Sequence, residues 1–144
     1  MSLYTKYIGQ EEAVMLEEFE VADVIPATPQ EIYDAWLDSD GHANMTGGGA
    51  MASAEVGASY TAWDGYITGE NIELEPPRRI VQTWRSSEFP TGTNDSRLEI
   101  VLDEVDGGTK VTFRHSQIPD GRGDSYKQGW VDHYFEPMKA YFGG

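Results

Sequence analysis

Three histidines, His42, His115 and His133, are the side chains best suited to acid–base or metal chemistry in this sequence. No pair of them has the short spacing, such as H-x-x-x-H, that places two metal ligands on one helix face. The sequence has no cysteine, and no serine lies in a Gly-x-Ser-x-Gly turn, so no nucleophile is evident. We therefore expect no metal site and no cofactor, and we expect any chemistry to depend on a histidine.

His115 is the histidine with the clearest inward position. It alternates with Val111 and Phe113, so in a β-strand all three side chains point to one face. An inward histidine can act as a general base or as a hydrogen-bond partner for a bound ligand. It can equally bond to a neighbouring backbone carbonyl, because buried polar groups usually find partners within the protein.

The four tryptophans fall into two groups. Trp36, Trp84 and Trp130 lie on predicted apolar faces, where they can fill a core or line a cavity, and each indole N–H needs an acceptor. Trp63 has the opposite strand parity to Tyr60, which favours a position outside the core.

Charged residues are distributed unevenly along the sequence. It has 25 acidic and 10 basic side chains, a net charge of −15, and Tyr7–Pro77 holds 15 of the acids but no lysine or arginine. The lack of a basic cluster argues against binding to nucleic acid or anionic lipid. The acidic excess is typical of solubility or adaptation to high salt, or else of a docking face for a basic partner. One face is strongly acidic only if the two halves of the sequence lie on different sides.

No segment of the sequence has the properties of a membrane span or an export signal. The longest apolar run is the four residues Ala13–Leu16, whereas a membrane-spanning helix needs about 20. The N-terminus lacks both the basic and the apolar region of a secretory signal. We therefore expect a cytoplasmic protein without a membrane partner.

The elements that must position these residues begin with strand and helix signals. Residues 1–10 are expected to form a loose arm, followed by a strand over about residues 16–25. Thr28-Pro29-Gln30-Glu31 is typical of a helix start, because the threonine and the glutamate can cap each other's backbone N–H groups. This helix should end near Asp38-Ser39-Asp40-Gly41, and the glycine-rich segment His42–Gly49 should form a loop or one irregular turn.

From about residue 50 to residue 116 the apolar residues recur with a period of two. Turn signals such as Asp106-Gly107-Gly108 separate the runs, which predicts an antiparallel meander of about five or six strands. In one of these runs Glu70 shares the parity of Ile72 and Leu74, so it is the acid to examine for burial.

The sequence ends with a predicted helix. Ser125-x-x-Gln128 is a second capping-box pattern. Pro137 offers no N–H to the carbonyl of His133, which predicts a kink near that position. This helix should cover the sheet, because each has one apolar face to bury. The apolar residues at helical spacing are Tyr126, Trp130, Tyr134, Met138 and Phe142.

Four stretches match motifs of a known family: Asp64-Gly65-Tyr66-Ile67-Thr68-Gly69-Glu70, Leu74-x-Pro76, Ile80-Val81-Gln82-Thr83-Trp84-Arg85 and Gly129-Trp130-Val131-Asp132-His133-Tyr134-Phe135-Glu136-Pro137-Met138-Lys139. Together they resemble the C-terminal domain of the activator of heat-shock protein 90 ATPase homologue (AHSA-type) family. His42-x-x-Met45-Thr46-Gly47 resembles the single-domain bacterial branch. The resemblance covers about residues 15–142.

This resemblance implies an α+β helix-grip fold of the START-like (SRPBCC) superfamily. In that fold an antiparallel β-sheet wraps around a long C-terminal helix and leaves an internal cavity. Members bind lipids, hormones or polyketides, some catalyse cyclisation or hydrolysis, and some are co-chaperones. The chaperone activators carry a separate N-terminal domain, for which this sequence leaves no room. We expect an N-terminal arm over residues 1–14 and a single domain over residues 15–144.

The leading hypothesis is a protein that binds a small, largely apolar molecule between the sheet and the terminal helix. One alternative is a chaperone-interacting module, with a chaperone as partner and a role in the stress response. Another is an enzyme that uses His115 as an acid or base on the bound molecule. The ligand's identity and the oligomeric state stay open. At least four of seven candidate residues should line an enclosed cavity: Trp36, Met45, Trp84, Phe113, His115, Trp130 and Tyr134.

Overall fold

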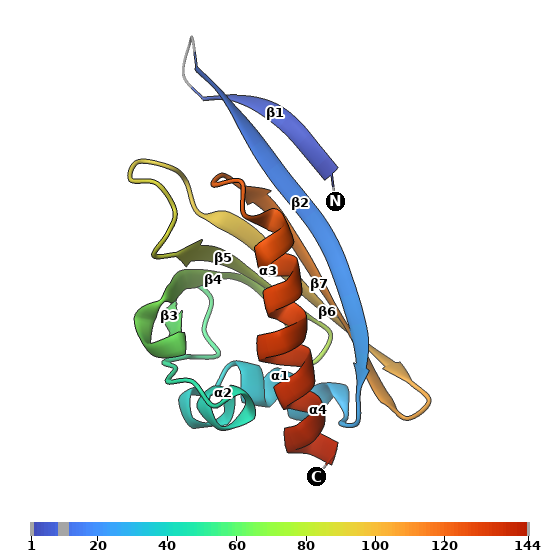
Figure 1. Cartoon of the computed structure of the whole chain (residues 1–144). Helices are drawn as coiled ribbons and strands as arrows, with labels where there is room; N and C mark the ends of the chain where they lie inside the picture. Colours follow the sequence, from blue (N-terminus) through green and yellow to red (C-terminus); the bar gives the residue numbers. More distant parts are fainter. Residues whose placement is uncertain (1, 9–11, 144) are drawn as a thin grey trace.

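An antiparallel β-sheet curves around one long C-terminal helix in the computed structural model, which describes residues 2–8 and 12–143 (Figure 1). Within these residues, seven strands form the sheet in the order β1-β2-β7-β6-β5-β4-β3. This is the expected α+β helix-grip architecture. The strands are β1 (Ser2–Ile8), β2 (Glu12–Ile25), β3 (Ser59–Ala62), β4 (Ile67–Glu75), β5 (Arg79–Ser86), β6 (Ser96–Val105) and β7 (Gly108–Ile118).

The N-terminal residues differ from the loose arm expected over residues 1–10. Strand β1 pairs with β2 along its length, with Tyr4 opposite Leu16, and it forms one edge of the sheet (Figure 1). The expected boundary after residue 14 falls inside β2. Residues 1 and 9–11 of the expected arm lie outside the described chain.

Two short helices, α1 (Pro29–Trp36) and α2 (Ser39–Thr46), connect β2 to β3. The capping box predicted for α1 is confirmed. The backbone N–H of Glu31 donates to the Thr28 hydroxyl over 3.1 Å, and the N–H of Thr28 donates to the Glu31 carboxylate over 3.0 Å. These bonds satisfy backbone donors that have no partner inside the helix.

Helix α2 corrects the loop predicted over His42–Gly49. The carboxylate of Asp38 accepts from the N–H of Gly41 over 2.8 Å and starts the helix. Gly47 ends it with a φ of 88°, a conformation that glycine adopts without steric cost. One of the glycines that favoured the prediction of a loop, Gly47, is therefore the C-cap of a helix.

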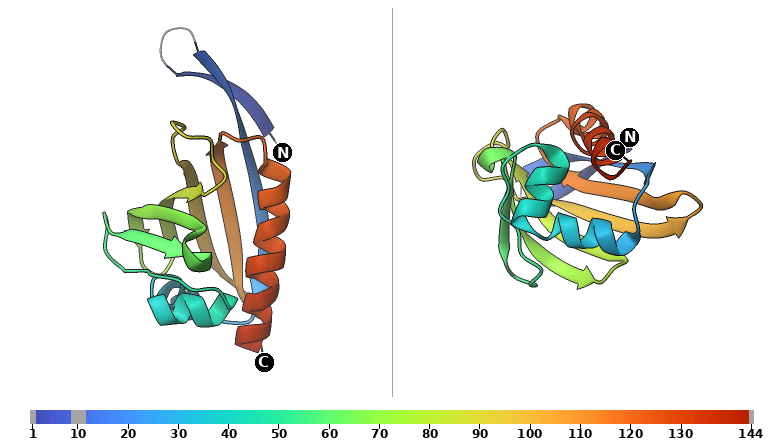
Figure 2. Two further views of the ribbon diagram at one scale, coloured as in Figure 1. Left: turned by 60° about the vertical axis from the view of Figure 1, so that its left-hand side comes forward. Right: turned by 90° about the horizontal axis from the view of Figure 1, so that it is seen from below.

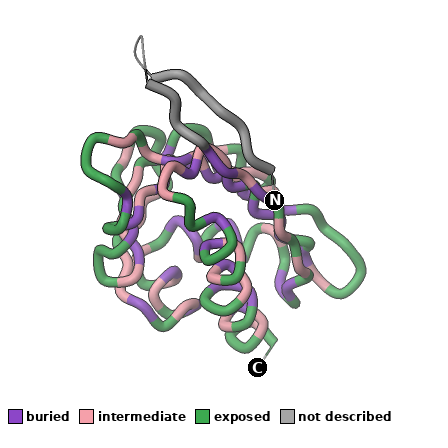
Figure 3. The backbone as a smooth tube through the Cα atoms, turned by 45° about the horizontal axis from the view of Figure 1, so that its top comes forward, coloured by how far each residue is buried: buried purple, intermediate pink, exposed green. Residues whose placement is uncertain are grey.

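The closing helix consists of α3 (Gly123–Trp130), a π-helical turn η2 (Val131–Phe135) and α4 (Glu136–Gly143), and it packs across the inner face of the sheet (Figure 2). A kink was predicted near His133, whose carbonyl loses its partner at Pro137, and at this place the structure has the widened π-helical turn. Buried residues follow the inner faces of the sheet and of this helix (Figure 3). No helix in the described chain is long and apolar enough to cross a membrane.

The second predicted capping box, at Ser125 and Gln128, is wrong. The helix begins at Gly123, and Arg122 precedes it without a side-chain cap. The N–H of Gly123 donates instead to the Glu17 carboxylate of β2 over 2.9 Å. A residue distant in sequence thus supplies the acceptor that the local motif was expected to supply.

Strand β4 departs from the predicted alternation. Its pairing with β5 shifts register between Asn71 and Glu73. Asn71, which has the parity of the buried Ile67, is buried, whereas Ile72 is 43% exposed. Glu70, the acid to examine for burial, is exposed as well, and the inward face expected for Ile72 is wrong.

Acids of the first half of the sequence lie against bases of the second half. Glu20 on β2 contacts Arg114 on the neighbouring β7 at 2.7 Å. Asp23 contacts Lys139 of the closing helix at 2.6 Å. The two halves therefore do not separate onto different sides, and the charge asymmetry partly cancels.

Candidate functional site

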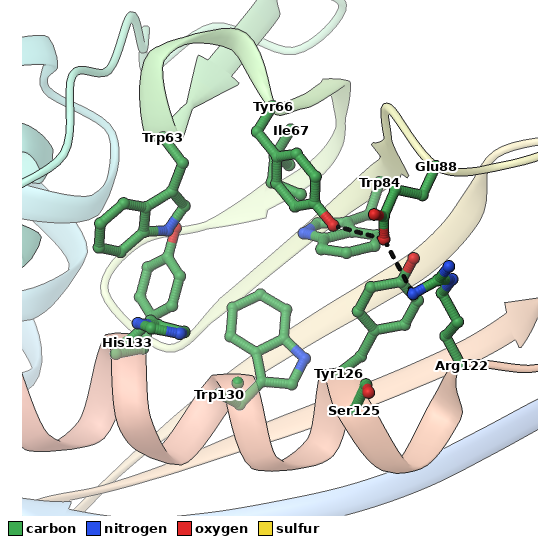
Figure 4. Close-up of a pocket in the computed structure, with 12 residues that line it drawn as sticks. Trp63, Tyr66, Ile67, Trp84, Glu88, Arg122, Ser125, Tyr126, Trp130 and His133 are labelled. Atoms are coloured by element: carbon green, nitrogen blue, oxygen red, sulfur yellow. Dashed lines mark hydrogen bonds and ion pairs between the residues drawn. The ribbon is translucent and has the colours of Figure 1, made fainter.

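An aromatic pocket lies between the closing helix and strands β4 and β5 (Figure 4). Its volume is about 480 Å³, within the range of small-molecule sites. It opens to solvent at a rim where Tyr66, Glu88 and Arg122 are exposed. Six aromatic side chains make most of its wall: Trp63, Tyr66, Trp84, Tyr126, Trp130 and Tyr134.

The inner wall is built by rings from the sheet and the helix. Trp84 of β5 packs edge-on against Tyr126, with ring centroids 4.9 Å apart, and lies 6.0 Å from Trp130. Trp130 and Tyr134 lie 4.8 Å apart on the helix, spacings typical of favourable aromatic pairs. Tyr134 belongs to the π-helical turn, a type of irregularity that often occurs at functional sites.

Trp63 lines the pocket, although its strand parity favoured an outside position. It opens a 3₁₀ turn, η1 (Trp63–Gly65), in which Trp63 and Asp64 have φ values of 52° and 57°. The strand alternation therefore stops before Trp63, and the indole turns toward Tyr134, with ring centroids 6.1 Å apart. Gly48 lies against the indole so closely that a β-carbon there would overlap the ring.

The polar groups of the pocket gather at its rim. Glu88 Oε2 accepts from the Tyr66 hydroxyl over 3.1 Å and lies 3.1 Å from Arg122 Nη1 (Figure 4). The Tyr126 hydroxyl donates to Asp120 over 2.6 Å. Burial, together with this bond to a carboxylate, raises the pKa of Tyr126, so the hydroxyl stays protonated and continues to donate.

The seven candidate lining residues separate into two groups. Three lie on the pocket wall: Trp84, Trp130 and Tyr134. Four are buried in the packed core behind it: Trp36, Met45, Phe113 and His115. Fewer than the expected four reach this wall, and the pocket is partly open instead of enclosed.

His115 is fully buried, and both of its ring nitrogens are engaged. The Ser96 hydroxyl donates to the Trp84 carbonyl over 2.8 Å, so its oxygen must accept from His115 Nε2, also at 2.8 Å. The indole N–H of Trp130 donates to Nδ1 over 3.1 Å. Burial lowers the pKa of His115 to about 3, so the ring is neutral. Neither nitrogen is free to contact a ligand or move its proton, and the geometry does not support the enzymatic alternative.

His42 occupies a similar closed environment. Its Nδ1 donates to the Trp36 carbonyl over 3.0 Å, and its Nε2 accepts from the Tyr134 hydroxyl over 3.0 Å. Burial lowers the pKa of His42 and raises that of Tyr134. His133 is exposed at the pocket, against Trp63. Among the residues whose side chains the structure describes, no three or more His, Cys, Asp or Glu form a group that could hold a metal ion.

A chain of buried amides behind the pocket was not foreseen from the sequence. The Trp36 indole donates to Gln82 over 3.2 Å, and the Gln82 amide donates to Asn71 over 2.9 Å. Asn71 then donates to the carbonyls of Ser53 and Glu55 over 2.7 and 2.9 Å. The indole, which can only donate, sets the direction of the whole chain. The one feature of the sequence that could have indicated this chain of amides was the position of Gln82, between Ile80 and Trp84 on the inward face of β5.

A sheet that curves around a long helix, with an aromatic pocket between them, is the arrangement of a START-like helix-grip protein. Residues 26–143 match the family described as "Activator of Hsp90 ATPase homolog 1-like protein", and the chain belongs to this family.

The relatives agree with that assignment. The human "Activator of 90 kDa heat shock protein ATPase homolog 1" is 28% identical over 116 residues, which cover 81% of this chain and 34% of the relative. The chain thus spans about a third of the curated relatives it matches. An HSP90 activator from Plasmodium falciparum has the same fold, with a TM-score of 0.79, 22% identity and coverage of 88% of this chain and 96% of that one. The Aha1 dimer from Colwellia psychrerythraea gives a TM-score of 0.73, 18% identity and coverage of 87% and 96%.

Proposed function

We propose that this protein binds a small, largely apolar molecule in the aromatic pocket. The observation that carries the proposal is the pocket itself, whose volume of about 480 Å³ is walled mainly by aromatic rings and edged by a few polar groups. Such a combination provides apolar area for affinity and a few hydrogen-bonding groups for orientation. The proposed contacts include Trp84, Trp130 and Tyr134.

Gly129 supports this proposal from the helix side of the pocket. Glycine inside a helix is unfavourable by about 1 kcal/mol relative to alanine. A β-carbon at Gly129 would have only the His133 ring as a neighbour, at 3.9 Å. Packing therefore does not require glycine here, and a glycine at this position leaves the space beside the helix open for the proposed ligand.

Filling the pocket from this position tests the proposal. Gly129→Leu should place a side chain in the open space and abolish binding of a ligand co-purified from the native host, as detected by native mass spectrometry. Ala140→Leu adds the same side chain at an exposed position of α4 and should leave binding intact. Co-purification of the same ligand with both variants would contradict the pocket as the binding site.

A chaperone-interacting module is the second candidate function, favoured by the names of the relatives. The human relative is an activator of a 90 kDa heat-shock protein ATPase, and this chain matches about a third of it. Pull-down with a 90 kDa heat-shock protein at low and moderate salt tests this candidate. A charge-driven contact should weaken as salt rises, and it should survive Gly129→Leu. Absence of any association at low salt would contradict it.

A further inference from the structure

The charged groups of the pocket are concentrated at its rim. Glu88 shares one carboxylate oxygen between Tyr66 and Arg122. Asp120, whose side chain is only 3% exposed, lies 3.9 Å from the same guanidinium. Two carboxylates thus surround one guanidinium, which leaves one negative charge uncompensated. The other oxygen of Glu88 has no partner among the described residues.

The rest of the wall is aromatic. Trp63 and Tyr66 extend from the β3–β4 connection toward the helix, and Trp130 extends from the helix toward them (Figure 4). The face of an indole or phenol ring is electron-rich and attracts cations. Besides the tyrosines, His133 is the remaining ionisable side chain of the lining, and it lies against Trp63, with ring centroids 5.6 Å apart.

We infer that the ligand is an organic cation, an ammonium group carried on a flat apolar body, and this inference rests on the proposed ligand-binding function. The apolar body would lie among the tryptophans, and the ammonium group would approach the free oxygen of Glu88. The Arg122 guanidinium is already paired with Glu88 and lies near Asp120, so it offers an anion less net positive charge than a free arginine would. The net charge of −15 adds a long-range attraction for cations and a repulsion for anions.

Three naphthalene probes that differ in charge test the inference on the intact chain. They are (2-naphthylmethyl)trimethylammonium, the neutral 2-(methoxymethyl)naphthalene and the anionic 2-naphthylacetate. Titration at pH 8 and low salt, followed by the NMR signals of the indole N–H groups, reports both affinity and location. The cation should bind roughly tenfold more tightly than the ether, and the carboxylate should bind most weakly. The signals of the three pocket tryptophans should shift more than that of Trp36.

Substitutions that each remove one charge then show which residue causes the preference for the cationic probe. Glu88→Gln should weaken binding of the cation roughly threefold and leave the ether unchanged. Glu70→Gln removes the same charge from an exposed position that does not line the pocket, and it should change neither affinity. Arg122→Gln should have the opposite effect and tighten cation binding roughly threefold, because it releases Glu88.

The outcomes separate this inference from the function on which it rests. If the ether binds at the pocket tryptophans and the cation binds no tighter, the pocket binds ligands but the charge preference is wrong. Tightest binding of the carboxylate, or equal weakening of all three probes by Glu88→Gln, would also overturn the inference. If no probe shifts the pocket tryptophans at millimolar concentration, both proposals fail.

Discussion

Trp84 and Trp130 separate two aromatic regions of similar composition and opposite character. Behind them lies a closed region that contains His115 and Phe113, where no described buried polar side-chain atom lacks a partner. In front lies the pocket, which contains the exposed His133 and the carboxylate of Glu88, only one of whose oxygens has a partner in the part of the chain that the structure describes. Residue type is therefore a poor guide to function here, and the presence of hydrogen-bonding groups without a protein partner distinguishes the proposed binding surface from the core.

The two regions should respond very differently to loss of a histidine. His115→Ala leaves the Trp130 N–H without its acceptor, deprives the Ser96 oxygen of its donor and creates a cavity, so it should lower the free energy of unfolding by about 3 kcal/mol. His133→Ala removes an exposed ring and should change it by less than about 0.5 kcal/mol. Urea denaturation measures both. Equal losses in the two variants would contradict the distinction between a closed region and an open pocket.

The closed region should also make stability depend on pH. An unfolded chain protonates His115 near pH 6.5, whereas burial lowers the pKa in the folded chain to about 3. Below pH 6.5 the unfolded state therefore binds more protons, and stability falls as pH falls. His115 alone should account for a loss of about 2 kcal/mol between pH 7 and pH 5. The lowered pKa of His42 acts in the same direction.

Urea denaturation at several pH values measures this loss. His115→Gln keeps a donor and an acceptor but cannot titrate in this range, so it should flatten the profile and leave the contribution of His42. A wild-type profile that is flat from pH 7 to pH 5 would show that His115 is not held neutral by burial.

The sequence predicted the parts of this molecule that short-range interactions determine. The Thr28–Glu31 capping box, the sheet and the closing helix all depend on residues within a few positions or on simple periodicity. Predictions failed where distant residues intervene. Glu17 replaces the cap expected at Ser125, and the register shift next to Asn71 reverses the faces of β4.

The candidate site shows the same limit. Periodicity could place Trp84, Trp130 and Tyr134 on inward faces. It cannot show whether an inward ring borders the packed core or a pocket open to solvent. Trp63 was missed because positive φ values end the strand alternation just before it contributes to the wall. The assignment of His115 to the cavity overlooked that Ser96 and Trp130 together use both of its nitrogens.

The smallest expected effect is that of replacing a glycine by alanine beside the pocket, compared with the same replacement where the sheet is tightly packed. Gly129→Ala adds a methyl group on the pocket side, where the nearest atom lies at 3.9 Å. It should raise the free energy of unfolding by about 0.5 to 1 kcal/mol, because alanine favours the helix. Gly69→Ala provides the contrast, since its β-carbon would overlap the Thr83 backbone and the Tyr60 ring, and it should destabilise the fold by about 1 to 3 kcal/mol. Thermal and urea denaturation of both variants measure the difference. If Gly129→Ala also destabilised the protein, the space beside that helix would already be filled by packing, and the case for glycine preserving a ligand site would be lost.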